Sequence, residues 1–308
     1  MSILEAENIC MTYETGGRIR KSEVRALRGV SLRVEKGECV GVVGESGSGK
    51  STLGRLLVGL EAPSSGSVRF EGKTLCVKKL PQKTRQALQL VYQNSFEATD
   101  PRFTAAEIVS EPLCCFCRMG TQQARERASQ LLREVGIPDD ELDKRAGSFS
   151  GGQLQRICIA RAIAANPLLI VLDEPLSSLD VSIQAQILNL LRDLKQTHDL
   201  TYVLISHDLE AVYYLADRLT VLYYGTVLEE IDDMRLFSRL SHPYTCELLR
   251  AANYEAETSE THIDRRTPVP DTGCPYAPRC PLKTERCDHE TPSLHLLESG
   301  HRAACFLL

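Results

Sequence analysis

The chain has 308 residues, of which 43% are hydrophobic and 25% are charged, as expected for a globular protein with one large core and a small appendage. Its net charge of −5 argues against a nucleic-acid-binding protein, because such proteins usually carry a basic surface. No run of about 18 apolar residues predicts a membrane-spanning helix, and the first residues do not resemble a signal peptide. We therefore expect a cytoplasmic protein whose thiols stay reduced.

Residues 1–38 are expected to form β structure, because short apolar runs alternate with glycines. Tyr13 lies between two of these runs. It is either an ordinary residue of an edge strand or an aromatic side chain that stacks on a purine ring.

A glycine-rich segment follows an apolar strand at 39–43 and precedes a helical run at 53–60. Its sequence, Gly44-Glu45-Ser46-Gly47-Ser48-Gly49-Lys50-Ser51-Thr52, fits the pattern of a phosphate-binding loop. Glycines let backbone N–H groups point at phosphate oxygens, and the N-terminal end of the next helix adds positive charge. We expect Lys50 to reach the β- and γ-phosphates and the Ser51 hydroxyl to bind Mg²⁺.

Residues 104–147 are predicted to be helical, because apolar residues recur on one helical face. Thr121 is expected to cap a helix there, and Gly136 to end it. A second helix is expected after Ser150-Gly151-Gly152-Gln153, where a serine and two glycines could bind an anion at the helix N-terminus.

Two adjacent acids, Asp173 and Glu174, follow a continuous apolar run at 168–172. Such a run predicts a strand buried on both faces, and ligands bind at the carboxyl ends of such strands. Asp173 fits a Mg²⁺ ligand, and Glu174 fits a general base for an attacking water. His207 follows the next buried strand, at 202–206, and is either a phosphate contact or a structural histidine.

Twelve cysteines are present, and eight of them lie between Cys10 and Cys246. We expect each of these eight to pack as a small apolar residue, including the close group Cys114, Cys115 and Cys117.

Together these segments resemble the nucleotide-binding subunit of ABC transporters over residues 1 to about 250. The resemblance is carried by the family's motifs in their usual order. These are the phosphate loop at 44–52, the Q-loop glutamine Gln93, the signature motif at 149–153, the Walker B acids Asp173 and Glu174, the D-loop at 177–180 and the switch histidine His207. Phe149 stands where the signature motif usually has leucine.

The resemblance implies a head-to-tail pair of ATPase chains that encloses two ATP molecules, so that closure depends on ATP and hydrolysis reopens the pair. The implied catalytic residues are Glu174, His207 and Lys50. The implied Mg²⁺ ligands are Ser51, Gln93 and Asp173. The implied ATP contacts are Tyr13, Gly44 to Thr52, Gln93, Ser150, Gly151, Gly152, Gln153 and Asp180.

A narrower resemblance, to the peptide/nickel importer branch, is carried by Asp100-Pro101-Arg102, Glu111-Pro112-Leu113 and His242-Pro243-Tyr244-Thr245. The usual Ser-Leu-Asn-Pro of that branch is altered here to Phe96-Glu97-Ala98-Thr99-Asp100-Pro101. In the family this segment faces the membrane partner.

Four cysteines gather near the C-terminus: Cys274, Cys280, Cys287 and Cys305. Their region resembles the C-terminal extension of oligopeptide/dipeptide importer ATPases, some of which carry a [4Fe-4S] cluster. Four thiolates suit that cluster or Zn²⁺, and a metal-free tail is the third alternative. The lack of a Cys-x2-Cys pair disfavours zinc. His289, His295 and His301 are expected at the surface rather than as ligands.

Sequence and resemblance together predict an α/β protein. We expect a phosphate-loop ABC ATPase core with an N-terminal antiparallel β lobe, a helical subdomain and a small cysteine-containing extension. The expected boundaries are 1–250 for the nucleotide-binding domain, near 104–147 for its helical subdomain, 251–266 for a linker and 267–308 for the extension.

The resemblance implies an ATPase subunit that powers import of peptides or nickel complexes at the cytoplasmic face of the membrane. The implied partners are two membrane-spanning permease subunits, an extracytoplasmic substrate-binding protein and an identical or paralogous ATPase, with no nucleic acid. Two alternatives stay open: a soluble ABC ATPase of DNA repair or translation, and a regulatory or redox protein that works through its cysteine tail.

Overall fold

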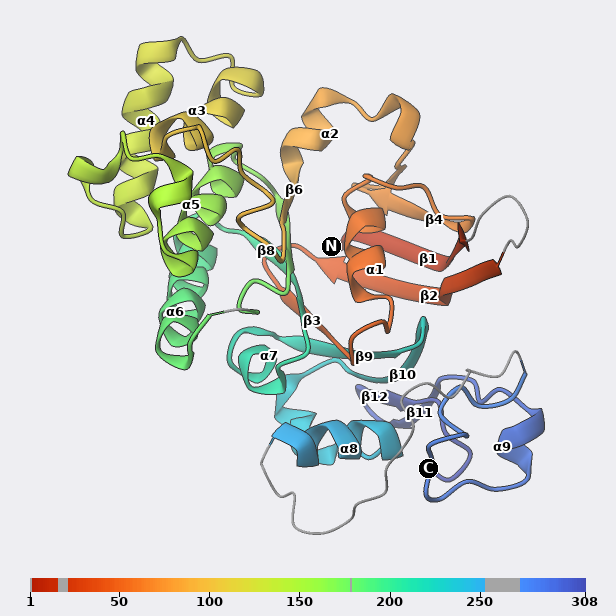
Figure 1. Cartoon of the computed structure of the whole chain (residues 1–308). Helices are drawn as coiled ribbons and strands as arrows, with labels where there is room; N and C mark the ends of the chain where they lie inside the picture. The colour runs from red at the N-terminus through yellow and green to blue at the C-terminus, as the bar shows by residue number, and fades with distance from the viewer. Residues whose placement is uncertain (1, 16–21, 178, 253–271) are drawn as a thin grey trace.

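The computed structural model describes residues 2–15, 22–177, 179–252 and 272–308 (Figure 1). Its strands are β1 (Ser2–Thr15), β2 (Ser22–Glu35), β3 (Cys39–Val43), β4 (Ser65–Phe70), β5 (Lys73–Thr74), β6 (Leu88–Val91), β7 (Leu169–Asp173), β8 (Thr201–Ser206), β9 (Arg218–Tyr223), β10 (Thr226–Ile231), β11 (His295–Glu298) and β12 (His301–Ala303). They form two sheets, with the orders β2-β1-β4-β5 and β11-β12-β10-β9-β3-β8-β7-β6. The α/β class and the antiparallel N-terminal lobe are therefore confirmed.

The central strands β9, β3, β8, β7 and β6 run parallel and are covered on both faces. In β8, Val203 and Ile205 pack against α1 (Lys50–Leu57) and the N-terminal lobe. The alternate residues, Tyr202 and Leu204, face the opposite core, which is lined by helices that follow residue 104. Because both faces are buried, the strand sequence is apolar throughout, as the continuous runs predict.

The remaining helices are α2 (Gln82–Ala87), α3 (Ala105–Cys115), α4 (Thr121–Glu134), α5 (Gly151–Ala164), α6 (Val181–Thr197), α7 (Leu209–Leu215), α8 (Pro243–Ala252) and α9 (Arg286–His289). Helices α3, α4 and α5 form an arm on the far side of the central strands from β1 and β2 (Figure 1). Thr121 is the first residue of α4 and Gly120 is its N-cap, so the expectation that Thr121 caps this helix is wrong. Gly136 does follow the end of α4, with a φ of 84° that favours glycine.

All twelve cysteines lie in the described part of the chain and are free thiols. Cys39 and Cys158 are buried as expected, but Cys76, Cys114 and Cys115 are exposed. The packing expectation is wrong for these three. In α3, the buried face ends at Leu113, so that the next two residues point toward solvent.

The C-terminal residues 272–308 extend the larger sheet. Strand β12 pairs with β10, so that Ala303 lies opposite Glu229 and His301 opposite Ile231. Most of the expected linker, residues 253–266, lies outside the described residues, whereas residues 251 and 252 end α8. Among the described helices, none is both long enough and apolar enough to cross a membrane.

Candidate functional site

The glycine-rich loop lies between the end of β3 and the start of α1, against the backbone of neighbouring strands. A Cβ on Gly44 would come within 2.1 Å of the Leu222 carbonyl oxygen, and one on Gly49 within 2.4 Å of the Ala26 carbonyl oxygen. Only glycine fits so close an approach of backbone to backbone. Gly49 is the N-cap of α1, and no side chain in the described part of the chain caps that helix. Its first N–H groups are therefore oriented for an anion.

Lys50 is buried beneath this loop. Its Nζ donates hydrogen bonds to the carbonyl oxygens of Gly44, at 2.6 Å, and of Glu45, at 2.8 Å. Burial lowers the pKa of Lys50, whereas the nearby Glu174 and Asp173 carboxylates raise it. The ammonium group is thus held inside the loop by backbone dipoles and two acids.

Ser51 and Asp173 lie side by side, although 122 residues separate them in the sequence. The Ser51 hydroxyl donates to the Asp173 carboxylate over 2.9 Å. Burial raises the pKa of Asp173, and the hydrogen bond from Ser51 lowers it. A hydroxyl and a carboxylate are hard oxygen donors of the kind that Mg²⁺ prefers, so this pair fits the ion.

Glu174 brings three of the predicted residues together at one carboxylate. Gln93 Nε2 donates to its Oε2 over 2.9 Å, and His207 Nδ1 lies 3.3 Å from the same oxygen. Lys50 Nζ lies 3.7 Å from Oε1. Glu174 has a φ of 46°, a left-handed conformation that is uncommon for a residue other than glycine. Strained backbone of this kind is concentrated at functional sites.

Tyr13 is connected to the loop through α1. Its hydroxyl donates to Glu61 at 2.5 Å and accepts from Arg55, whose guanidinium also bonds Glu61 at 2.6 Å and the Thr52 hydroxyl at 3.3 Å. The structure thus places Tyr13 beside the helix that begins in the phosphate loop.

The signature residues lie in the helical arm, apart from α1 (Figure 1). Ser150 caps α5 in a capping box: its hydroxyl accepts from the Gln153 N–H, and the Gln153 side chain accepts from the Ser150 N–H. Gln153 also donates to Glu141 within the arm. Asp180 caps α6 by accepting from the Ile183 N–H over 3.0 Å. Ser178, in the D-loop between them, lies outside the described residues.

Sequence reasoning missed a set of contacts between the loop and the C-terminal region. The Arg279 guanidinium bonds both carboxylate oxygens of Glu45, at 2.7 and 2.9 Å. The Glu45 N–H donates to the Tyr244 hydroxyl over 2.9 Å. Tyr244 belongs to the His242–Thr245 segment noted in the sequence, and Arg279 lies in the cysteine-containing extension, but neither signal indicated a contact with the loop.

The four C-terminal cysteines lie close to one another, and the pKa values of three of their thiols are shifted. Burial raises the pKa of the Cys274, Cys280 and Cys305 thiols, and neighbouring cysteine thiolates raise them further. Backbone N–H groups of residues 276, 282 and 307 act in the opposite direction. Even so, the described residues contain no group of three or more His, Cys, Asp or Glu side chains that could hold a metal ion as they stand.

The histidines near these cysteines differ from one another. His289 is exposed, as expected, and His295 is half-buried in β11. His301 is buried, and its Nε2 lies 2.8 Å from the buried carboxylate of Glu229. The expectation that His301 lies at the surface is wrong, since its partner on β10 could not be seen in the local sequence.

Two family models of known proteins match different parts of the chain. A family model described as ABC transporter matches residues 27–177, and one described as oligopeptide/dipeptide transporter, C-terminal region, matches residues 228–287. The dipeptide transport ATP-binding protein DppF of Haemophilus influenzae is 39% identical, covering 93% of this chain and 90% of its own. The di/tripeptide transport ATP-binding protein DppF of Pseudomonas aeruginosa is 38% identical, covering 99% and 97%.

Among solved structures, a dimeric post-hydrolysis state of the ATP-binding cassette MJ0796, bound to ADP and Pi, is similar with a TM-score of 0.66. It is 30% identical and covers 74% of this chain and 97% of its own.

Proposed function

Since this chain belongs to the ATP-binding, ATP-hydrolysing proteins of ABC transporters, we propose that it powers the import of peptides through separate membrane subunits. The observation that carries the proposal is the convergence of Lys50, Gln93 and His207 on Glu174, beside the Ser51–Asp173 pair. Peptides are the proposed cargo because the two DppF relatives are named for dipeptide and di/tripeptide transport. Nickel complexes have only the sequence resemblance in their favour.

In the proposed site, the loop N–H groups and Lys50 bind the β- and γ-phosphates. Ser51, Asp173 and Gln93 would hold Mg²⁺, which neutralises charge on those phosphates when bound. Glu174 accepts a proton from the water that attacks the γ-phosphorus. A water oxygen–phosphorus bond forms, the bond from phosphorus to the bridging oxygen breaks, and ADP and phosphate result. His207 positions Glu174, and Tyr13 stacks on the adenine.

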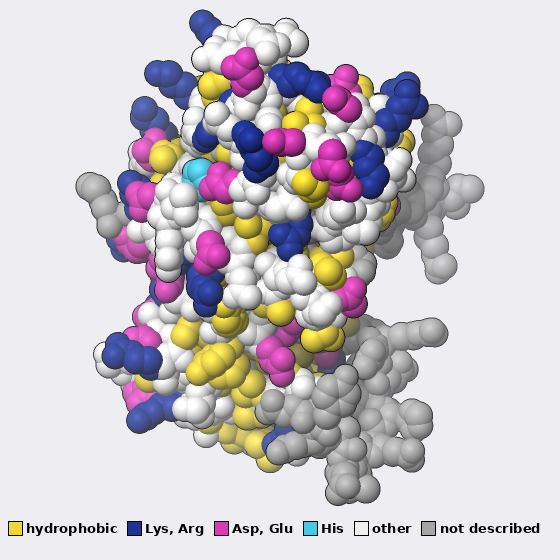
Figure 2. Space-filling model, turned by 90° about the vertical axis from the view of Figure 1, so that its left-hand side faces the viewer, with side chains coloured by type: hydrophobic (Ala, Val, Ile, Leu, Met, Phe, Trp, Pro, Cys, Tyr) yellow, Lys and Arg dark blue, Asp and Glu magenta, His cyan; other side chains and the backbone are white. Residues whose placement is uncertain are grey.

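We propose that two ATPase chains pair head to tail, so that Ser150 to Gln153 of one chain and the phosphate loop of the other bind the same ATP. Support comes from the separation of these motifs within one chain and from the dimeric state of MJ0796. Val181, next to Asp180, is a hydrophobic side chain that is 81% exposed. Figure 2 views the molecule from the side of the helical arm and shows hydrophobic side chains exposed among the charged ones. The partner is a second copy or a paralogue.

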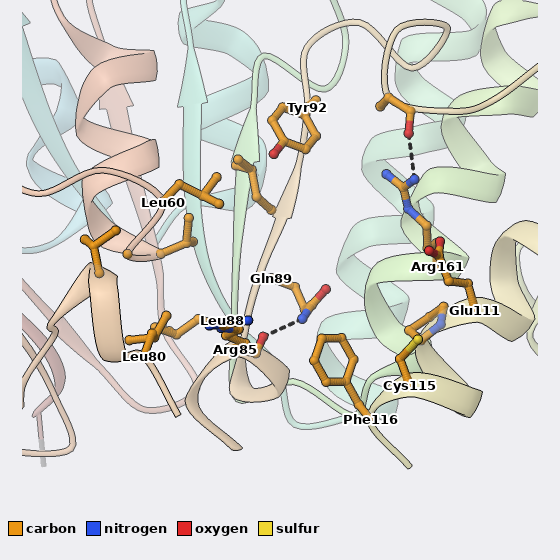
Figure 3. Close-up of a pocket in the computed structure, with 16 residues that line it drawn as sticks. Leu60, Leu80, Arg85, Leu88, Gln89, Tyr92, Glu111, Cys115, Phe116 and Arg161 are labelled. Carbon is orange, nitrogen blue, oxygen red and sulfur yellow. Dashed lines mark hydrogen bonds between the residues drawn. The ribbon is translucent and has the colours of Figure 1, made fainter. Parts of the chain in front are cut away.

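A groove of about 620 Å³ is the proposed contact with the permease subunits. It lies between β6 and the end of α3, where Gln89 is directed toward Phe116 (Figure 3). Phe96, in the segment where this chain departs from its branch, is 53% exposed nearby in the sequence. An exposed apolar surface of this kind is typical of a protein contact. Docking there would hold the chain at the cytoplasmic face of the membrane, opposite an extracytoplasmic substrate-binding protein.

The test is transport by cells whose chain carries Lys50→Ala. We expect uptake of a labelled dipeptide to be lost, because the variant cannot hold ATP. Uptake of labelled nickel should be unchanged, because nickel complexes are not the proposed cargo. Loss of nickel uptake with normal dipeptide uptake would contradict the proposed cargo. Stimulation of the purified ATPase by DNA or ribosomes would instead favour a role in repair or translation.

We also propose that Cys274, Cys280, Cys287 and Cys305 bind a [4Fe-4S] cluster. Support comes from the proximity of these cysteines, with the Cys274 N–H donating to the Cys287 carbonyl oxygen over 2.8 Å, and from the backbone N–H groups directed at the thiols, because such donors stabilise bound thiolates. The thiols are not arranged as a metal site as they stand, so binding would require them to move closer together. Iron and zinc analysis of anaerobically purified protein tests the proposal. A colourless, iron-free sample would contradict it, and zinc in that sample would indicate the alternative ion.

A further inference from the structure

Glu45, the second residue of the phosphate loop, is held from outside the nucleotide-binding core. Arg279 bonds both oxygens of its carboxylate, and the Tyr244 hydroxyl accepts from its N–H. Its carbonyl oxygen accepts from Lys50 Nζ. Side chain, N–H and carbonyl are thus all engaged, and two of the three contacts come from the C-terminal region. The Glu45 side chain is directed to Arg279 rather than serving as a free group of the loop.

Arg279 is fixed by its surroundings. Its side chain is only 6% exposed, and a second nitrogen contact, to Glu247 of α8, measures 2.5 Å. Its guanidinium carbon lies 5.8 Å and 5.9 Å from the ring centres of Tyr223 and Tyr276. A bidentate pair between arginine and carboxylate is among the stronger and more directional hydrogen-bonded pairs. Loss of Arg279 would leave the carboxylates of both Glu45 and Glu247 without this compensating charge.

The Arg279–Glu45 pair lies at the loop that is proposed to bind ATP, so the charge of Glu45 affects ATP binding. An uncompensated carboxylate in the loop would repel the polyphosphate that the loop binds, because the charge of Glu45 is near enough to act on Lys50 and like charges in a partly buried site repel strongly. We propose that Arg279 is a positioning residue for ATP, which acts through Glu45 by neutralising its carboxylate and holding it against the C-terminal region. This inference rests on the proposed placement of ATP at the loop.

The same contact joins the cysteine tail to the nucleotide site. Arg279 directly precedes Cys280, and the N–H groups of both donate to the Tyr276 carbonyl oxygen over 3.0 Å. The cysteine tail and the phosphate loop are therefore connected through the turn at 276–280 and the Arg279–Glu45 pair.

The experiment compares MgATP binding by full-length variants at a temperature where all are folded. Arg279→Gln removes the charge that compensates Glu45, and we expect it to weaken MgATP binding by about fivefold. Glu45→Gln combined with Arg279→Gln removes the repelling carboxylate as well, and we expect it to restore most of the lost affinity. Arg286→Gln is the matched control, because Arg286 lies in the same extension but forms an exposed pair with Glu290.

Rescue by the second substitution separates this role from a structural one. If Arg279 only stabilises the tail, Arg279→Gln lowers the melting temperature, leaves the affinity of the folded protein unchanged and overturns the proposal. A double variant that binds ATP more weakly than Arg279→Gln also overturns it. Should Arg279→Gln fail to fold, Glu45→Gln alone must bind MgATP at least as tightly as wild type, because it removes the carboxylate that Arg279 is proposed to neutralise, and weaker binding would overturn the proposal. Failure of wild type and Arg286→Gln to bind MgATP would refute the nucleotide site itself.

Discussion

Glu174 shows how much of the site depends on single side chains. One carboxylate receives an amide donor from Gln93, faces His207 and lies near the Lys50 ammonium. Its neighbour Asp173 is turned instead toward Ser51. Two adjacent acids thus have separate partners, as expected if one binds an ion and the other takes a proton.

Glu174→Gln is the direct test of the proton acceptor. We expect phosphate release to fall by about 10²–10⁴-fold, because an amide cannot accept the proton of the attacking water. ATP-driven pairing should survive, since the amide keeps the size and most of the hydrogen bonds of the carboxylate. Both are measured on the same sample, by phosphate release and by sedimentation with MgATP. Glu210→Gln, an exposed change on α7, should hydrolyse normally, and normal hydrolysis by Glu174→Gln would refute the assignment.

At the level of elements, α5 and α6 are in contact at a glycine. A Cβ on Gly152 would lie 2.6 Å from Cγ2 of Ile183, at the start of α6. A Cβ on the preceding Gly151 would meet Leu179 at an ordinary 3.6 Å. The two glycines of the signature motif therefore differ: the second sets the distance between the helices, and the first does not.

This difference predicts unequal costs for the same substitution. Gly152→Ala should lower the free energy of unfolding by about 1–2 kcal/mol, because the added methyl group forces α5 and α6 apart. Gly151→Ala, one residue away, should leave stability nearly unchanged. Urea denaturation of both variants measures the difference. Equal stabilities would show that Ile183 yields without displacing the helix.

Elements with continuous apolar runs could be predicted closely from the sequence. The bounds of strands β3, β7 and β8 lie within one residue of the expected apolar runs. Because these strands are buried on both faces, their sequences are apolar at nearly every position and are easily recognised. The exposure of Cys114 and Cys115 could not be predicted, because it depends on which face α3 turns inward. The cap of α4 was displaced by one residue, since Gly120 occupies the position expected for Thr121.

At the level of the whole molecule, the C-terminal region is joined to the core through a buried polar cluster. Glu229 on β10 is completely buried and accepts from the backbone N–H groups of Ser241, at 2.8 Å, and His242, at 3.2 Å. His301 on β12 contacts the same oxygen. His242 is itself buried, and its Nδ1 accepts from the Tyr244 N–H over 3.1 Å.

The burial of His242 predicts acid sensitivity. Loss of hydration lowers the pKa of His242 to about 4, whereas the Glu229 charge acts in the opposite direction. The unfolded chain regains an ordinary histidine and binds a proton below about pH 6.5. Between pH 6.5 and 4, the unfolded state therefore holds more protons, and stability falls as the pH falls.

We expect this histidine to remove about 2 kcal/mol of unfolding free energy between pH 7 and 5. His242→Gln should flatten that part of the profile, while His289→Gln, at an exposed histidine, should leave it unchanged. Urea denaturation across the pH range provides the measurement. A profile equally steep in His242→Gln would assign the proton uptake to another group.

The site was predictable where its residues form contiguous motifs, as in the loop and at the ends of β7 and β8. The Arg279–Glu45 contact could not be predicted, because 234 residues separate the partners and no sequence motif contains both of them. The buried pairing of His301 with Glu229 spans 72 residues and was missed for the same reason. Only the folded chain brings these charges together.

Pairing of β12 with β10 also protects the edge of the larger sheet. A chain that ended after α8 would leave the backbone donors and acceptors of β10 free to pair with a strand of another molecule. Such a fragment would be prone to self-association and aggregation even with its catalytic residues intact. The tail therefore covers the backbone of β10 as well as contacting the phosphate loop.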